Sequence, residues 1–269
     1  MQCKVLVDNM SCQLHLLAEW GYALHLATPS GDMLLDTGGH GHILTHNAAL
    51  LGVDWSRLVA VVLSHGHFDH TCGLSDVLAL APGAQVWGAP SLARERRAGK
   101  SAERVDGGGP FLALSALRPV DLEAEILPGV TAFVVPEAAR DPAFIYADTL
   151  WEVLPGQPPR HDTFADDLSL LVEGEQGVSL LLGCAHSGLP NILAYARDHF
   201  GVKSFHTVIG GTHLSAFSGA KLTASIEAMK AFDVRHWRPN HCTGFAAAAA
   251  LACQFSDVQW AGAGSLIAL

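Results

Sequence analysis

Charged side chains are scarce in this chain, and basic ones are scarcer than acidic ones. Only 16% of the 269 residues are charged and 49% are hydrophobic, so we expect most of the chain to pack and little of it to be disordered. The 16 lysines and arginines face 26 acidic residues, which gives a net charge of −10 with histidine neutral. This balance argues against nucleic acid or an anionic membrane surface as the main partner.

Long hydrophobic runs and cysteine pairs are also missing. The first five residues lack the apolar core of a secretory signal, and no apolar stretch approaches the length of a membrane span. The six cysteines are scattered, with no C-x-x-C pair and no spacing typical of a disulfide framework. We therefore expect reduced thiols and a cytoplasmic protein. We expect one domain over residues 1–269, a length that allows a sizeable core.

Histidine, in contrast, is abundant, and several of the 15 histidines follow apolar runs. The densest group is the stretch 64–70, Ser-His-Gly-His-Phe-Asp-His, directly after Val-Ala-Val-Val-Leu, which is typical of a buried strand. In an extended loop, His65 and His67 point the same way and can share one metal. Asp69 and His70 stand where a helix would begin and can turn toward a second. Because imidazole and carboxylate bind zinc, iron and manganese well, this stretch predicts a metal site.

The hydrophobic pattern predicts hairpins in the first part of the chain and alternating strands and helices in the last part. We expect helices over residues 43–51, 73–80, 91–97, 191–200 and 221–232. The helix at 91–97 would expose its basic residues, Arg94, Arg96 and Arg97. The polar, glycine-rich stretch 100–110 indicates an exposed loop. The stretch between residues 120 and 159 contains strand candidates at 130–135 and 144–146.

Three later strand ends also carry a histidine in a glycine-containing turn. His186 lies in Gly-Cys-Ala-His-Ser-Gly, His213 in Gly-Gly-Thr-His, and His241 in Asn-His-Cys-Thr-Gly. A single histidine at such a place is more often structural than a metal ligand. Their recurrence at strand ends indicates loops that could meet around one site.

The H-x-H-x-D-H motif after an apolar strand resembles the signature of the metallo-beta-lactamase superfamily, and Leu-Asp-Thr-Gly at 35–38 resembles the turn that precedes it. The motifs around the three later histidines, with Val-Asp-Asn at 7–9 and Glu-Trp-Gly at 19–21, resemble one branch. That branch is named after an archaeal dihydropterin–ribofuranosylaminobenzene phosphate synthase. The resemblance covers nearly the whole chain. It implies an α/β fold, a four-layer αββα sandwich of two mixed sheets with helices outside and the metal site at one edge.

The same resemblance implies a binuclear site completed by later residues. His241 takes the place of the last histidine ligand, and His186 is the candidate for the remaining one, with His161 as an alternative that has a loop composition around it. In the wider superfamily the aspartate that bridges the two metals stands in a Gly-Asp pair. The corresponding pair in this chain is Gly183-Cys184. Cys184 is therefore either a thiolate ligand or a small buried residue. Asp167 either reaches the site or is a turn carboxylate.

The metal ligands expected are thus His65, His67, Asp69, His70, His186 and His241, with zinc as the first choice, one or two ions, and iron or manganese as alternatives. Asp69 and His213 are the expected catalytic residues: the carboxylate orients the attacking water, and the histidine binds substrate or transfers a proton, unless it is only a structural turn residue. Asp36 is expected to orient a ligand histidine or the loop backbone.

These residues predict a metal-dependent hydrolase acting on a small anionic molecule: a phosphoester, a lactone or a thioester. The alternative is a synthase-like transferase that releases pyrophosphate, which calls for arginine or lysine near the site. The sequence offers few such residues at strand ends. A non-catalytic sensor or redox module on the same fold is the third hypothesis, and the chain leaves no room for the flavin that such di-iron members need. The sequence does not specify an oligomeric state.

Overall fold

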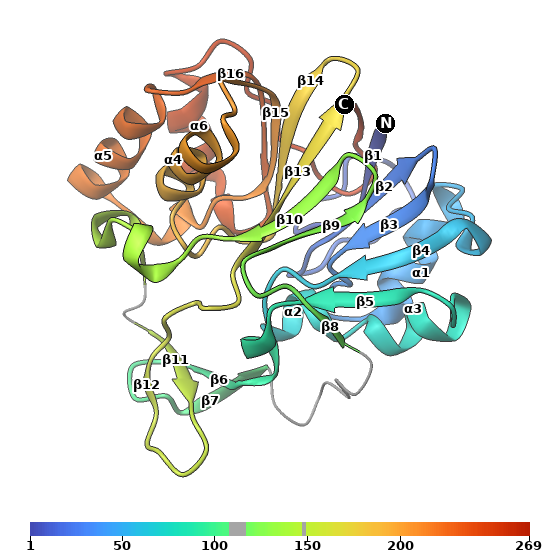
Figure 1. The fold of residues 1–269 in the computed structure, drawn as a ribbon, viewed down its shortest axis with the longest axis horizontal. Coiled ribbons are helices and arrows are strands. Elements are labelled where there is room, and N and C mark those ends of the chain that lie inside the picture. The colour runs from blue at the N-terminus through green and yellow to red at the C-terminus, as the bar shows by residue number, and fades with distance from the viewer. Residues whose placement is uncertain (108–116, 147–148) are drawn as a thin grey trace.

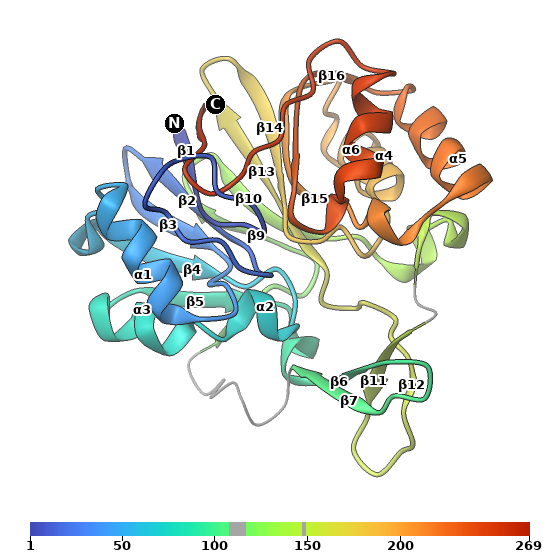
Figure 2. The same ribbon diagram turned by 180° about the vertical axis from the view of Figure 1, so that it is seen from behind.

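Two mixed β-sheets lie face to face, with helices on the outer side of each (Figures 1 and 2). The structure, a computed structural model, describes residues 1–107, 117–146 and 149–269. The four-layer αββα sandwich expected from the sequence is confirmed. The chain termini lie close together at one end of the sandwich (Figure 1).

The first sheet has seven strands, six from the first part of the chain and one from its last residues. Its order is β17 (Leu266–Ala268), β1 (Gln2–Val7), β2 (Ala23–Thr28), β3 (Gly31–Leu35), β4 (Leu58–Val62), β5 (Gln85–Gly88) and β8 (Leu117–Pro119). The strands from β17 to β3 pair antiparallel, as predicted for hairpins, and those from β3 to β8 pair parallel. Helices α1 (Gly41–Leu50) and α3 (Leu74–Leu80) cover its outer face (Figure 2).

The second sheet has six strands in the order β16 (Asp233–Asn240), β15 (Ser204–Gly211), β14 (Gly177–Leu182), β13 (Leu168–Gly174), β10 (Val130–Val134) and β9 (Glu123–Leu127). The pairs β14·β15 and β15·β16 are parallel and the others antiparallel. Helices α4 (Leu189–Phe200), α5 (Gly219–Met229) and α6 (Phe245–Ala252) pack on its outer face. None of the described helices is long and apolar enough to cross a membrane.

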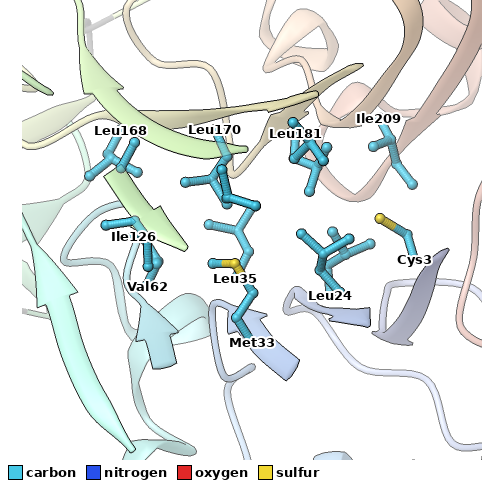
Figure 3. Packing of buried hydrophobic residues seen from close by; sticks show 14 of the residues in the cluster. Cys3, Leu24, Met33, Leu35, Val62, Ile126, Leu168, Leu170, Leu181 and Ile209 are labelled. Carbon is cyan, nitrogen blue, oxygen red and sulfur yellow. The ribbon is translucent and has the colours of Figure 1, made fainter. Parts of the chain in front are cut away.

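The main core fills the space between the two sheets. Figure 3 shows Leu168, Leu170 and Leu181 of the second sheet pointing toward Leu35 and Met33 of the first. Alternate residues of each strand face inward, as the two-residue period of a strand requires. Burial of apolar surface contributes about 25 cal/mol per Å², so this continuous layer stabilises the two sheets against each other.

A third, four-stranded sheet projects from one end of the sandwich, and the sequence did not predict it (Figure 1). Its order is β12 (Arg160–His161), β11 (Leu150–Val153), β6 (Glu95–Ala98) and β7 (Arg104–Gly107). The helix expected at 91–97 is wrong, because a 3₁₀ turn at Pro90–Ala93 leads directly into β6. The exposed loop expected at 100–110 is wrong where β7 forms, and residues 108–110 lie outside the described residues.

The small sheet also overturns the expected exposure of one arginine. Arg96 is 1% exposed, because its guanidinium pairs with Asp162 at 3.1 Å and Asp166 at 2.6 Å. The strand candidate at 144–146 is wrong as well, since Pro142–Phe144 forms a 3₁₀ turn. Further 3₁₀ turns lie at Trp55–Arg57, Glu137–Ala139, Leu214–Ala216 and His241–Thr243.

Candidate metal centre

Four strand-end loops meet at one edge of the sandwich. The loop after β4 carries the histidine motif, and the short helix α2 (Phe68–Thr71) begins within it. The loops after β14, β15 and β16 bring His186, His213 and His241 to the same place. All of these side chains line one cavity of about 590 Å³ together with residues of the histidine motif.

His65, His67 and His186 form the first cluster. Their ligand atoms lie within 4.8 Å of one another, and Nε2 of His186 is 3.2 Å from Nε2 of His65. Two nitrogens on one tetrahedral zinc ion stand about 3.3 Å apart when each Zn–N bond is about 2.0–2.1 Å. Nε2 of His67 is buried and has no hydrogen-bond partner among the residues that the structure describes. A buried, unpaired nitrogen beside two others at ligand spacing fits a metal ion.

Asp69, His70 and His241 form the second cluster. Nε2 of His70 is 3.2 Å from Nε2 of His241, and a carboxylate oxygen of Asp69 lies 3.4 Å from the latter nitrogen. The same oxygen lies 3.8 Å from Nε2 of His70. The three ligand atoms lie within 4.8 Å of one another, and all three side chains are buried. The arrangement therefore offers a second position with two imidazoles and one carboxylate.

Hydrogen bonds at Nδ1 turn the imidazoles so that Nε2 faces the centre. Nδ1 of His70 lies 2.7 Å from Asp36, and Nδ1 of His241 lies 2.9 Å from the side-chain oxygen of Asn9. Nδ1 of His65 lies 2.8 Å from the Ser64 hydroxyl. Partners of this kind fix the orientation of the ring. Where the partner accepts the hydrogen of Nδ1, it also fixes the tautomer in which Nε2 is free to bind a metal.

Burial and neighbouring charges set the protonation of these groups. Burial lowers the pKa of His67 to about 3 and holds the pKa of His65 and His186 well below the ordinary value, so these rings are neutral. Burial acts in the same direction on His70, but the carboxylates of Asp36 and Asp69 outweigh it and raise its pKa to about 9. Burial opposes ionisation of Asp69, yet the adjacent His70 and His241 bring its pKa well below the ordinary value.

The segment 162–167 forms hydrogen bonds to the loops that carry His65 and His186, and the sequence indicated little of this role. Asp166 accepts a hydrogen bond from the Gly66 backbone at 2.8 Å, and Asp167 accepts one from Ser187 at 2.7 Å. The ring of Phe164 stacks on His186 with centroids 4.4 Å apart. Asp167 thus supports the loop of His186 through the backbone, and none of the candidate ligand groups among the described residues includes it.

The glycine at position 66 is required by this packing, and the sequence interpretation did not use it. A Cβ atom at this position would lie 2.3 Å from the Leu92 carbonyl oxygen and 2.5 Å from the Arg96 guanidinium. Only glycine lets the motif approach the buried arginine so closely.

The remaining candidate residues, His213, Cys184 and His161, lie in different surroundings. His213 lines the cavity, with its ring centroid 4.4 Å from that of His186, and burial lowers its pKa to about 4. Cys184 is 4% exposed, and its sulfur lies 3.2 Å from Nε2 of His70. His161 is exposed on β12, where its ring stacks on Trp151 at 4.2 Å, and it belongs to neither cluster.

Asp106, on β7, is a pocket residue that the sequence did not indicate. It is 8% exposed, and one of its oxygens lies 3.9 Å from Nε2 of His67. Burial, followed by the charge of Asp69, raises its pKa to about 6. The mouth of the cavity also has apolar side chains, and the described lining residues outside the two clusters are Trp20, Phe68, Arg104, Val105, Asp106, Leu150, Cys184, His213 and Cys242.

Residues 22–202 match the metallo-beta-lactamase superfamily, and the chain belongs to that superfamily. It is similar to the 7,8-dihydropterin-6-methyl-4-(beta-D-ribofuranosyl)-aminobenzene-5'-phosphate synthase of Methanocaldococcus jannaschii, with 24% identity over 80% of this chain and 76% of that one. It is 27% identical to the uncharacterized protein MJ0448 of the same organism over 99% of both chains. The solved structure of Tm1679, described as a metal-dependent hydrolase of the beta-lactamase superfamily, superposes with a TM-score of 0.84 at 26% identity and covers 100% of this chain and 99% of that one.

Proposed function

We propose that the protein is a binuclear metal-dependent hydrolase that acts on a small ester-type molecule: a phosphoester, a lactone or a thioester. The observation that carries the proposal is the pair of ligand clusters, one of three histidines and one of two histidines and Asp69, on the wall of one cavity. Divalent ions held by these residues, zinc being the first choice, would lower the pKa of a water and polarise the substrate oxygen.

The residues of the chain have distinct tasks in this reaction. The three neutral imidazoles of the first cluster present nitrogen lone pairs without first losing a proton. Asp69 stays ionised, so it accepts a hydrogen bond from the attacking water and fixes its direction. The neutral ring of His213 faces the same cavity and donates an N–H to a substrate oxygen.

The lining of the cavity supports a small substrate with one anionic group. A volume of about 590 Å³ falls in the usual range for small-molecule sites. Arg104 is the one cation among the described lining residues, and its side chain is 72% exposed at the mouth. Trp20 and Phe68, which are 59% and 37% exposed, give the substrate an apolar surface to rest on.

The alternative is a transferase that joins two molecules and releases pyrophosphate, as the name of the archaeal relative describes. Several anionic phosphates would have to bind in the cavity at once, which calls for several arginines or lysines. The described lining residues include one arginine and two carboxylates, Asp69 and Asp106, and this balance supports hydrolysis better.

Two measurements test the proposal. Protein purified without added metal should contain one to two equivalents of zinc, iron or manganese by elemental analysis. It should turn over at least one member of a panel of phosphodiesters, lactones and thioesters. His65→Ala should lose about one equivalent of metal and the turnover, whereas the exposed His161→Ala should leave both intact. Turnover only when a pterin diphosphate and an arylamine are supplied together would favour the transferase instead.

A further inference from the structure

Cys184 lies between the two ligand clusters, at the end of β14. The strand ends at Leu182, and the Gly183 carbonyl accepts a hydrogen bond from Gly211 of the neighbouring strand at 2.9 Å. This pairing fixes the backbone just before the cysteine. The side chain lines the metal cavity and is 4% exposed.

Two different sets of ligand atoms share the Cys184 sulfur. In one set it lies within 4.8 Å of ligand nitrogens of His65 and His70, and in the other within 4.8 Å of His241 and Cys242. His65 belongs to the three-histidine cluster, whereas His70 and His241 belong to the second cluster. The sulfur is therefore within reach of both metal positions at once.

The distance to the nearest nitrogen also fits a ligand. The sulfur lies 3.2 Å from Nε2 of His70. A thiolate and an imidazole on one tetrahedral zinc ion stand about 3.6 Å apart, given bonds of about 2.3 and 2.0–2.1 Å. Nδ1 of the same ring is held by Asp36, so Nε2 points to the centre, where it meets the sulfur as well as Nε2 of His241 and the Asp69 carboxylate.

We propose that the Cys184 thiolate is a ligand shared by the two metal positions of this site. It fills the place between them that a carboxylate would otherwise take, and binding releases its proton to solvent. The inference rests on the binuclear site of the proposed function. It adds a soft donor, which favours zinc, cobalt or iron over manganese and magnesium.

Cys242 has a different role, although its sulfur is also near. Its Sγ accepts a hydrogen bond from the backbone of His213 at 3.3 Å and lies 3.7 Å from the Cys184 carbonyl oxygen. A Cβ atom on Gly211 would come within 2.6 Å of this sulfur. The sulfur is packed into backbone on these sides, and no ligand group among the described residues joins it to the first cluster. We assign Cys242 to holding the turn, and because it shares a candidate ligand group with Cys184 and His241, Cys242→Ser tests the competing thiolate.

Cobalt(II) gives a readout that does not depend on activity. Metal-free, reduced protein is titrated with Co²⁺ under argon, while near-ultraviolet absorption reports thiolate-to-cobalt charge transfer and elemental analysis reports stoichiometry. The wild-type protein should bind two equivalents and show the charge-transfer band. Cys184→Ala should lose the band and one equivalent, and Cys184→Asp should bind two equivalents without the band. Cys242→Ser should keep both.

The outcomes separate this inference from the function on which it rests. Two bound equivalents in the wild-type protein without the band would overturn the shared thiolate and leave the binuclear hydrolase standing, and this result needs no variant to fold. A band that survives Cys184→Ala, or is lost only in Cys242→Ser, would also overturn it. Failure to bind cobalt at all would overturn both proposals.

Discussion

Asp36 and His70 are joined by a 2.7 Å contact between a carboxylate oxygen and Nδ1, with both side chains fully buried. The same carboxylate accepts hydrogen bonds from the backbone nitrogen and the hydroxyl of Ser64, each at 2.7 Å. One side chain therefore fixes the start of the histidine loop and the ring at its end. Asp36 adopts this place with φ +64, a left-handed conformation that aspartate and asparagine tolerate better than most residues.

We predict that Asp36→Asn weakens metal binding about 10- to 100-fold while the protein still folds. Asparagine suits the left-handed backbone, but it lacks the charge that holds the imidazole. Competition with a chromophoric chelator measures the affinity. Asp121→Asn, at an exposed position, is the control and should bind as the wild-type protein does. An Asp36→Asn protein with unchanged affinity would show that the carboxylate serves only the loop.

We predict that His186→Ala and His241→Ala each lose about one equivalent of metal, because the two residues belong to different clusters. His161→Ala should keep the full amount, since His161 lies exposed on β12. Elemental analysis after dialysis against metal-free buffer measures the content. Loss of metal from His161→Ala with retention in His186→Ala would reverse the assignment of the third histidine.

The histidine loop could be proposed as a metal site from sequence because its candidate ligands are neighbours in the chain. His65, His67, Asp69 and His70 depend only on a strand, a turn and the start of a helix, which local pattern reveals. The same local pattern placed His186 and His241 at strand ends, and the resemblance to the superfamily made them candidate ligands. The sequence could not show that the two histidines belong to different clusters, because this depends on the pairing of strands that are far apart in the chain.

Arg96 shows where this reasoning failed. Three arginines in seven residues are typical of a solvated helix, and no local feature distinguishes the middle one. Its partners Asp162 and Asp166 follow 66 and 70 positions later, and only the tertiary fold brings them beside β6. Asp106 was missed for a similar reason. It lies in a polar, glycine-rich stretch, and such a composition does not indicate that the stretch lines a cavity.

We predict that Arg96→Met destabilises the protein by about 3–5 kcal/mol, because it leaves two buried carboxylates without their cation. Urea unfolding of the metal-free protein measures the effect. Arg97→Met is the matched control: its side chain is 36% exposed and pairs with Glu95 on the surface, so the change should stay within about 1 kcal/mol. Equal losses in the two variants would mean that the Arg96 pairs contribute no more than a surface pair.

We predict that Asp106→Asn stabilises the metal-free protein at neutral pH. The pKa of Asp106 rises from 3.8 to about 6 on folding, chiefly through burial. Between these values the folded protein holds a proton that the unfolded chain releases, so this group costs stability as the pH rises and the cost is complete above about pH 6. At about 1.4 kcal/mol per pKa unit, the gain should reach up to about 3 kcal/mol at pH 7.5 and fall to about 0.5 kcal/mol at pH 4.

Urea unfolding at the two pH values measures this gain, with Asp121→Asn as a control that should show none. A gain of the same size at both pH values would contradict the titration of Asp106 and indicate a packing effect. Zinc should reduce the gain in stability at pH 7.5. Nε2 of His67 lies 3.9 Å from the Asp106 carboxylate, so a cation bound at His67 favours the ionised form of Asp106. The size of that reduction reports how strongly Asp106 senses the charge bound at the three-histidine cluster.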